Sequence, residues 1–273
     1  MHDPQGLPAP RRTLLVGCGK LGLRLAERLR REGREVVALR RDISGLPASV
    51  NPIAADLRAP VERALPEVDA MVITLPPSVD PDGYPAVLER LRAALPANPA
   101  RTIFVSSTGV FEGWEGPQPI MEVAVPQPHS ERAVRIRQGE LAAIDLFGAV
   151  VVRPAGIYGP GRDFLVRTVR DGRPITAGTR TNRIHETDLV RALHALLVDE
   201  RPPAVLHAVD AAPAPLGDVT DYIAGLMGVA SPPESETPGR RGNIFDGAYL
   251  REYVGHLEYP SYRDGYREMV SAP

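Results

Sequence analysis

Short apolar runs alternate with longer amphipathic segments along most of this chain. A short apolar run bounded by turn residues is typical of a buried strand, whereas apolar positions three and four residues apart indicate one buried face of a helix. Because the two patterns alternate, we predict an α/β protein with a doubly wound parallel sheet. The predicted strands are 13–16, 35–39, 52–54, 70–75, 102–106 and 149–152; predicted helices follow residue 20 and occupy about 84–95 and 131–147.

The first predicted strand ends in a glycine-rich loop, the G-x-G-x-x-G string GCGKLG. Between a strand and a helix, such a loop builds a dinucleotide site, because Gly17 permits a tight turn and Gly19 lets the backbone approach a pyrophosphate. Gly22 lets the helix pack closely, and the helix N-terminus presents N–H groups to the phosphates. The alternative to a dinucleotide site is an ordinary glycine-containing turn between a strand and a helix. We assign Gly17, Cys18, Gly19, Lys20, Leu21 and Gly22 to the cofactor site.

The residues after the second predicted strand select the cofactor. An NAD site usually has Asp or Glu here to hold the ribose 2′-OH, whereas Arg accommodates the 2′-phosphate of NADP. Arg40 and Arg41 stand where a bidentate phosphate clamp is needed, so we predict NADP. Asp42 keeps NAD open as the cofactor, and a solvated basic turn is the structural alternative.

Other loops supply further candidate contacts to the cofactor. Asp56 follows the third predicted strand and can hydrogen-bond the adenine edge, with a simple turn Asp as an equal alternative. The Pro76-Pro77 pair breaks the chain after the fourth predicted strand. We also assign Leu57, Leu75, Pro76 and Ser106 to the cofactor site.

Length, charge and cysteine content exclude several classes of protein. With 273 residues, the chain can bury a substantial core as one large or two unequal domains. A net charge of −2 without a basic run gives no footprint for nucleic acid. The single cysteine, Cys18, excludes an internal disulfide and fits a reducing cytosol.

No apolar run reaches transmembrane length, and residues 1–10 lack the apolar centre of a signal peptide. We therefore expect a cytoplasmic protein without membrane contact. We assign no metal ligands.

Turn residues multiply after Val152, as in the strings GPG, GRP and SPP. We therefore predict an NAD(P)-binding Rossmann-type domain at 11–153 and a smaller substrate-binding lobe at 154–273. The apolar run at 204–208 is expected to rejoin the sheet. An aromatic, Arg-rich segment at 240–266 either closes over a ligand or packs as a tail.

Three later strings, taken together and in order, resemble one family. They are IFVSSTGVF at 103–111, VRPAGIYGPG at 152–161 and NRIHETDL at 182–189. They resemble the extended, epimerase/dehydratase-like branch of the short-chain dehydrogenase/reductase superfamily, and the resemblance runs from about Leu14 to Tyr266. It implies an NAD(P)-dependent enzyme.

The resemblance also implies site residues. In that family a Ser or Thr hydroxyl beside the nicotinamide hydrogen-bonds a substrate carbonyl and stabilises oxyanion charge. Its position relative to Val110 selects Ser107, with Thr108 as the neighbouring candidate. The family's backbone contacts near the nicotinamide fall here on Pro154, Gly156 and Ile157.

The chain departs from the family at the proton relay. Family members carry Tyr-x-x-x-Lys, in which Lys lowers the pKa of Tyr so that the phenol acts as general acid and base. The only lysine here is Lys20. Aligning Glu140 with the family places Arg132 at the Tyr position and Ile136 at the Lys position. The chain therefore resembles atypical members that keep the cofactor fold without the relay.

Several side chains can replace the relay. His129 is titratable and close to the lost Tyr position in sequence, while Tyr158 and His185 come from other loops. Arg132 can serve as a fixed electrophile, as can Arg135. The structural alternatives are a surface His129 before an N-cap Ser130, and His185 with Asp188 at a helix start, where Thr187 or Asp188 caps the helix.

Three functions fit these observations. The first is an NADP-dependent oxidoreductase that reduces a small carbonyl or imine substrate. The second is an epimerase or dehydratase on a sugar-like substrate, and the third is a non-catalytic NADP-binding or redox-sensing protein. The expected partner is a small-molecule substrate. A homodimer is compatible with the apolar positions at 134–147, which fit an intramolecular core equally well.

Overall fold

The structure is a computed structural model that describes residues 9–237 and 241–271. The chain divides into two compact units, each described separately below. Within the described residues, the first unit holds 9–110, 128–153 and 192–206, and the second holds 111–127, 154–191 and 207–271. The predicted aromatic segment begins at Arg240, which lies outside the described residues.

A seven-stranded sheet organises the fold, in the order β10-β6-β5-β4-β1-β2-β3. Strand β1 pairs in parallel with both β2 and β4, so the chain reverses its direction across the sheet at this point. Ligands bind at such a switch point, at the carboxyl ends of the strands. The doubly wound parallel sheet is thereby confirmed. Its strands are β1 (Arg12–Val16), β2 (Glu35–Arg40), β3 (Asn51–Ala54), β4 (Ala70–Ile73), β5 (Arg101–Val105), β6 (Val150–Pro154) and β10 (Val205–Ala208).

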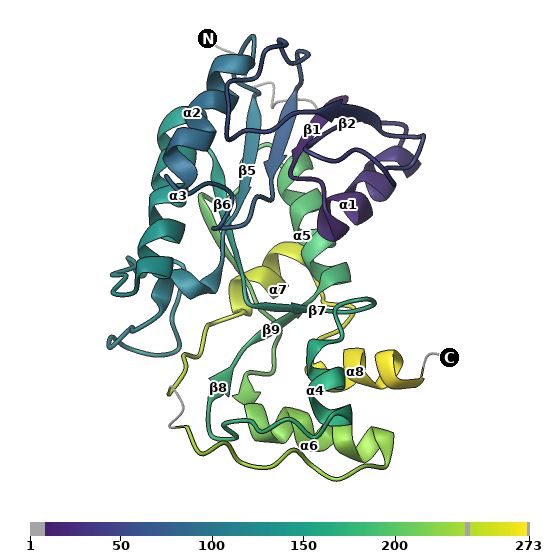
Figure 1. Cartoon of the computed structure of the whole chain (residues 1–273), viewed down its shortest axis with the longest axis vertical. Helices are drawn as coiled ribbons and strands as arrows, with labels where there is room; N and C mark the ends of the chain where they lie inside the picture. The colour runs from purple at the N-terminus through teal and green to yellow at the C-terminus, as the bar shows by residue number, and fades with distance from the viewer. Residues whose placement is uncertain (1–8, 238–240, 272–273) are drawn as a thin grey trace. The chain divides into compact units, whose positions relative to one another are not determined.

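Helices cover both faces of the sheet in the first unit. Helix α1 (Lys20–Arg31) lies on one face, and α2 (Tyr84–Ala94) and α3 (Glu131–Phe147) lie on the other (Figure 1). The apolar spacing of α1 places Leu21, Leu25 and Leu29 in the core, as the periodicity predicts. Helices at the predicted positions of α2 and α3 are confirmed.

Local chemistry sets the ends of α3 and its packing. The Ser130 side chain accepts a hydrogen bond from the Ala133 amide at the N-terminus, and Gly148 ends the helix at φ 60°. At Gly139 a Cβ would lie 2.5 Å from the Tyr84 ring, so only glycine lets the helices approach this closely. Tyr84 and Phe104 meet edge to face beneath this contact.

One predicted strand is shorter than expected. The pattern predicts 70–75, but β4 ends at Ile73. The Thr74 hydroxyl donates to the carbonyls of Val16 and Gly17, and Leu75 packs beneath Gly17. The last two residues of the predicted strand therefore support the glycine loop.

The second unit has its own core, which includes Val169, Val219, Ile223 and Tyr266. It holds two small sheets, β7 with β9 in parallel and β8 with β11 antiparallel. The remaining elements of the chain are η1 (Thr108–Phe111), β7 (Gly156–Tyr158), α4 (Phe164–Arg170), β8 (Arg180–Thr181), β9 (Arg183–His185), α5 (Glu186–Val198), β11 (Ala214–Pro215), α6 (Leu216–Met227), α7 (Ala248–Val254) and α8 (Tyr262–Ser271).

Candidate functional site

A cavity of about 920 Å³ lies in the first unit, at the carboxyl ends of β1, β2, β3 and β4. Its volume is in the range of pockets that hold small ligands and cofactors. The loop after each of these strands contributes to the wall, and Arg135 of α3 completes it. The cavity therefore occupies the place where an open α/β sheet binds its ligand.

The cavity brings together many of the residues assigned to the cofactor from sequence. Lys20, Leu21 and Gly22 instead form the start of α1, and Ser106 directly follows β5. Pro154, Gly156 and Ile157 belong to the second unit, where their contact with a nicotinamide stays a prediction. The assigned residues that line the cavity are Gly17, Cys18, Gly19, Arg40, Arg41, Asp56, Leu57, Leu75 and Pro76.

The three glycines of the loop have distinct geometries. Gly17 has φ 80°, and a Cβ there would lie 2.9 Å from Leu75, so the turn requires glycine. At Gly19 the nearest atom to a Cβ would be 3.8 Å away, which leaves space over the backbone for an approaching phosphate. At Gly22 a Cβ would lie 3.1 Å from the sulfur of Cys18. The buried Cys18 is thus a packing residue, and burial raises the pKa of its thiol to about 11.

Basic side chains stand at the cavity wall beside the glycine loop. Nη1 of Arg40 donates to the carbonyl of Cys18 at 3.3 Å, and Arg41 is exposed to solvent. The neighbouring Asp42 accepts a hydrogen bond from the Ser44 amide, and hydrogen bonding to Ser44 lowers the pKa of its carboxyl. Two guanidinium groups are therefore available at the wall, while the adjacent carboxylate is held in a turn.

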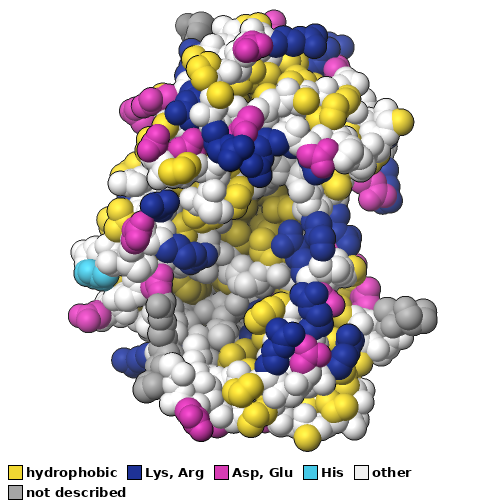
Figure 2. Space-filling view, viewed as in Figure 1, with side chains coloured by type: hydrophobic (Ala, Val, Ile, Leu, Met, Phe, Trp, Pro, Cys, Tyr) yellow, Lys and Arg dark blue, Asp and Glu magenta, His cyan; other side chains and the backbone are white. Residues whose placement is uncertain are grey.

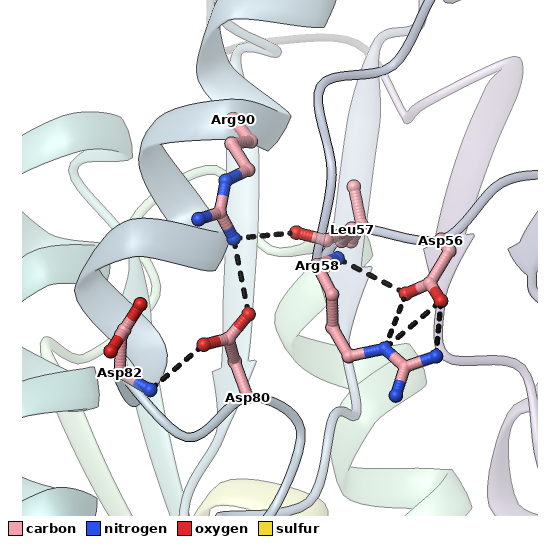
Figure 3. A network of polar contacts seen from close by, with 6 residues as sticks. All are labelled: Asp56, Leu57, Arg58, Asp80, Asp82 and Arg90. Carbon is pink, nitrogen blue, oxygen red and sulfur yellow. Dashed lines mark hydrogen bonds and ion pairs between the residues drawn. The ribbon is translucent and has the colours of Figure 1, made fainter.

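A polar clamp joins three elements on the adjoining side of the cavity (Figure 3). Nη1 of Arg90, on α2, donates to the Leu57 carbonyl and to the Asp80 carboxylate, both at 3.1 Å. The other oxygen of Asp80 accepts from the Asp82 amide. The clamp holds the loops after β3 and β4, which both line the cavity, against α2.

The predicted catalytic turn follows β5 in the first unit. The Ser107 hydroxyl accepts a hydrogen bond from the Gly109 amide at 3.0 Å. A Cβ on Gly109 would lie 2.8 Å from Nη1 of Arg132, 3.2 Å from the Ser107 hydroxyl and 3.5 Å from Ile136. Arg132 and Ile136 therefore face the serine turn together, as the alignment with Tyr and Lys implies.

A buried ionic network lies behind this turn. The Glu140 carboxylate accepts two hydrogen bonds from Arg153, one from Arg137 and one from the Ser106 hydroxyl. Burial alone would raise the pKa of Glu140, but the hydrogen bonds and charge of Arg153, aided by Ser106 and Arg137, hold it below its ordinary value. The network fixes Ser106, and so the strand end that carries Ser107.

The other predicted catalytic residues in this unit are His129 and Thr108. His129 is exposed and stands one residue before Ser130, the N-cap of α3. Thr108 is half-buried at the start of η1. Catalytic roles for His129 and Thr108 stay predictions.

Tyr158 and His185 lie together in an aromatic cluster of the second unit. Both are almost fully buried, and their rings meet edge to face at 5.1 Å. Tyr158 also stacks on Tyr266 and donates to the Ser261 carbonyl, while His185 stacks on Tyr259. Burial, followed by the charge of Asp210, raises the pKa of Tyr158 far above its usual range. Each side chain has a structural role here, and a catalytic role for either stays a prediction.

Asp188 is not a helix cap. Helix α5 begins at Glu186, and the Asp188 carboxylate accepts from the amides of Glu258 and Tyr259 and from Arg191. Asp188 therefore ties the segment before α8 to the start of α5.

Asp210 is expected to make the stability of the second unit depend on pH. It is buried, and although Oδ1 accepts from the Ala212 amide, Oδ2 has no partner within the described residues. Burial raises the pKa of its carboxyl to about 7. Between the unfolded pKa near 4 and this value, the folded state binds more protons, so the free energy of unfolding should fall as pH rises, by up to about 1.4 kcal/mol per pH unit.

The variant Asp210→Asn should remove this dependence, since its side chain does not titrate. Thermal melting from pH 4 to pH 8 measures it. The exposed Asp218→Asn serves as the matched control and should keep the parent's slope. An Asp210→Asn slope equal to that of the parent would contradict the assignment.

Basic and acidic side chains both occur on the face of the molecule drawn in Figure 2. All but one of the 32 basic side chains are arginine. In the part of the chain that the structure describes, no helix is long and apolar enough to cross a membrane.

Sequence reasoning assigned no cofactor role to several residues of the cavity. Asp80 and Arg58 lie in the loops after β4 and β3, and no motif marks either of them. Arg135 was considered only as an electrophile, although it lines the cavity. Position in the sequence was the available signal. Arg58 and Asp80 each follow a predicted strand, and Arg135 precedes the position aligned with the family's lysine.

The chain matches no protein-family model and no curated protein. Solved structures do resemble it. One is a protein of Methylobacillus flagellatus provisionally assigned as an NAD-dependent epimerase/dehydratase, with 29% identity, coverage of 94% of this chain and 96% of that chain, and a TM-score of 0.81.

Two more distant structures share the fold. MoeE5, solved with UDP-glucuronic acid and NAD, is 23% identical, with coverage of 93% of this chain and 96% of that chain and a TM-score of 0.74. UDP-glucuronic acid 4-epimerase of Bacillus cereus, solved with the same two ligands, is 16% identical, with coverage of 95% and 98% and a TM-score of 0.76.

Proposed function

We propose that this chain is an NADP-dependent oxidoreductase, on the premise that it belongs to the epimerase/dehydratase-like branch of the short-chain dehydrogenase/reductase superfamily. The first unit binds the cofactor in its cavity, and the substrate is a small molecule with a carbonyl or imine group. A bound nicotinamide would supply the hydride; the chain's own residues hold and polarise the acceptor.

The cavity fits a dinucleotide. Gly19 leaves backbone exposed beside the N-terminus of α1, where N–H groups favour a pyrophosphate. Arg40 and Arg41 lie on the same wall and fit a 2′-phosphate. Similar structures hold NAD, which therefore remains the second choice of cofactor.

The position of Arg132 is the observation that carries the proposed reaction. Its guanidinium lies over Gly109, beside the Ser107 hydroxyl. A guanidinium stays protonated at every physiological pH, so Arg132 cannot take up a proton. It can stabilise the negative charge that develops on a carbonyl oxygen during reduction, and Ser107 can donate a hydrogen bond to the same oxygen.

A sugar epimerase or dehydratase is the second candidate. The complexes of MoeE5 and the Bacillus cereus epimerase with UDP-glucuronic acid favour it. Oxidising a hydroxyl requires a base to remove its proton, and neither Arg132 nor Ser107 is one. His129 would have to serve, although it is exposed before α3. Reduction instead needs a proton delivered to the new alkoxide, which is basic enough to take it from water, so we rank it first.

A panel of aldehydes, ketones and imines tests the reaction. Under the proposed function, at least one compound drives stoichiometric oxidation of NADPH, followed at 340 nm. Product formation from a UDP-sugar without net consumption of cofactor would favour the epimerase instead. Micromolar binding of cofactor without turnover of any compound would favour a non-catalytic NADP-binding protein.

A second copy of the chain remains a proposed partner. Three apolar side chains of α3 are exposed, namely Val134 by 36%, Leu141 by 50% and Ile144 by 42%. Sedimentation velocity distinguishes a homodimer from a monomer, and a monomer would contradict this proposal.

A further inference from the structure

Arg58 holds the carboxylate that the sequence assigns to the adenine. Its Nε lies 3.0 and 2.9 Å from the two oxygens of Asp56, and Nη2 donates to one of the same oxygens. Figure 3 shows the two side chains turned toward each other beside the backbone of Leu57. The Arg58 amide also donates to Asp56. In this arrangement both oxygens of Asp56 are engaged by the residue two positions later.

The pair stands in the wall of the cofactor cavity, which Arg40 and Arg41 also line. Hydrogen bonding from Arg58, with a smaller contribution from the charge of Arg41, lowers the pKa of Asp56 to about 2. Arg41 and Arg58, from the loops after β2 and β3, therefore both act on one carboxylate. Two guanidinium groups that act on a single anionic group form a site that also suits a phosphate.

We propose that Arg58 is a specificity-determining residue. Its guanidinium moves away from Asp56 and, together with Arg40 and Arg41, binds the 2′-phosphate of NADP. The proposal deepens the proposed function and rests on it. Nη1 of Arg58 has no partner in the described part of the chain, so the guanidinium can take a phosphate oxygen at once.

Moving Arg58 away from Asp56 requires little free energy. The side chain of Arg58 is 51% exposed and that of Asp56 is 37% exposed. Ion pairs in such contact with water contribute little to stability. A phosphate dianion competes well for the guanidinium, and the transfer frees Asp56 to accept a hydrogen bond from the adenine amino group.

NAD offers no such exchange. Without a 2′-phosphate, nothing draws Arg58 from Asp56, and the carboxylate stays engaged. Loss of Arg58 would also leave the negative charge of Asp56 without a neighbouring cation that offsets its repulsion of the 2′-phosphate. Both effects act on NADP alone, which makes Arg58 a source of selectivity.

Two fragments that differ only by the 2′-phosphate isolate the effect from catalysis. Adenosine 2′,5′-bisphosphate and adenosine 5′-monophosphate are titrated calorimetrically into the full chain, into Arg58→Ala and into Arg63→Ala. Arg63 is an exposed arginine farther along the same loop that does not line the cavity, which makes it the matched control. Melting temperatures confirm that the variants fold.

We expect Arg58→Ala to weaken the bisphosphate about tenfold, which equals about 1.4 kcal/mol, and not to weaken the monophosphate, since Asp56 is then free for the adenine. Arg63→Ala should change neither. An equal loss for both fragments, or no loss for either, would overturn the role of Arg58. If the parent binds both fragments equally, the preference for NADP itself fails. The parent's ratio thus tests the proposed cofactor, and the variant's change tests Arg58.

Discussion

Replacing Arg132 with alanine is expected to lower kcat/KM for carbonyl reduction about a hundredfold while leaving the Kd of the cofactor unchanged. The guanidinium lies beside Ser107 and over Gly109, and Arg132 is not among the residues that line the cofactor cavity. Its loss removes a charge that acts on the transition state, so kcat should carry most of the effect. Steady-state kinetics with a substrate from the panel measure it.

Two further variants control this experiment. Arg132→Lys keeps the charge without the planar fork and should recover part of the activity. Arg30→Ala, on the exposed side of α1, should match the parent. A kcat/KM for Arg132→Ala within threefold of the parent would remove Arg132 from the reaction and would return the search to His129 and Tyr158.

Replacing Glu140 with alanine is expected to lower the free energy of unfolding by about 3–5 kcal/mol. Glu140 and Arg153 are both almost fully buried, and the change leaves the Arg153 guanidinium in the core without its carboxylate. Urea denaturation followed by circular dichroism measures the loss. Because Glu140 also accepts a hydrogen bond from the Ser106 hydroxyl, loss of this network should loosen the turn that carries Ser107.

A double variant separates the buried charge from the packing. Glu140→Leu combined with Arg153→Met removes both charges and should be more stable than Glu140→Ala. Glu131→Ala breaks an ion pair of the same helix whose carboxylate is 82% exposed, and it should change stability by less than about 1 kcal/mol. A loss of that size for Glu140→Ala would show that the buried pair contributes little.

Local patterns predicted the elements that local forces decide. Glycines at 17, 19 and 22 need no distant partner to mark a strand-to-helix turn, and the structure places the cavity beside that turn. The apolar spacing of 131–147 predicted α3 to the residue, because Ser130 and Gly148 cap it on the two sides. The alignment of Arg132 through Glu140 also depends only on spacing along one helix.

Contacts between segments that lie far apart along the chain could not be predicted from the sequence. Arg90 clamps Leu57 and Asp80, which stand 33 and 10 positions away along the chain, and no local rule pairs them. The burial of Tyr158 against Tyr266 likewise arises from tertiary packing. For the same reason Tyr158 and His185, which sequence motifs suggested as acid or base candidates, lie in a packed aromatic cluster.

The affinity of the chain for NADP relative to NAD tests the account most directly. Isothermal titration of the parent should give one site per chain, with NADP bound in the micromolar range and at least tenfold more tightly than NAD. The double variant Arg40→Ala with Arg41→Ala should bring the two dissociation constants close together, mainly by weakening NADP. Equal affinities in the parent, or no binding of either dinucleotide, would contradict the account.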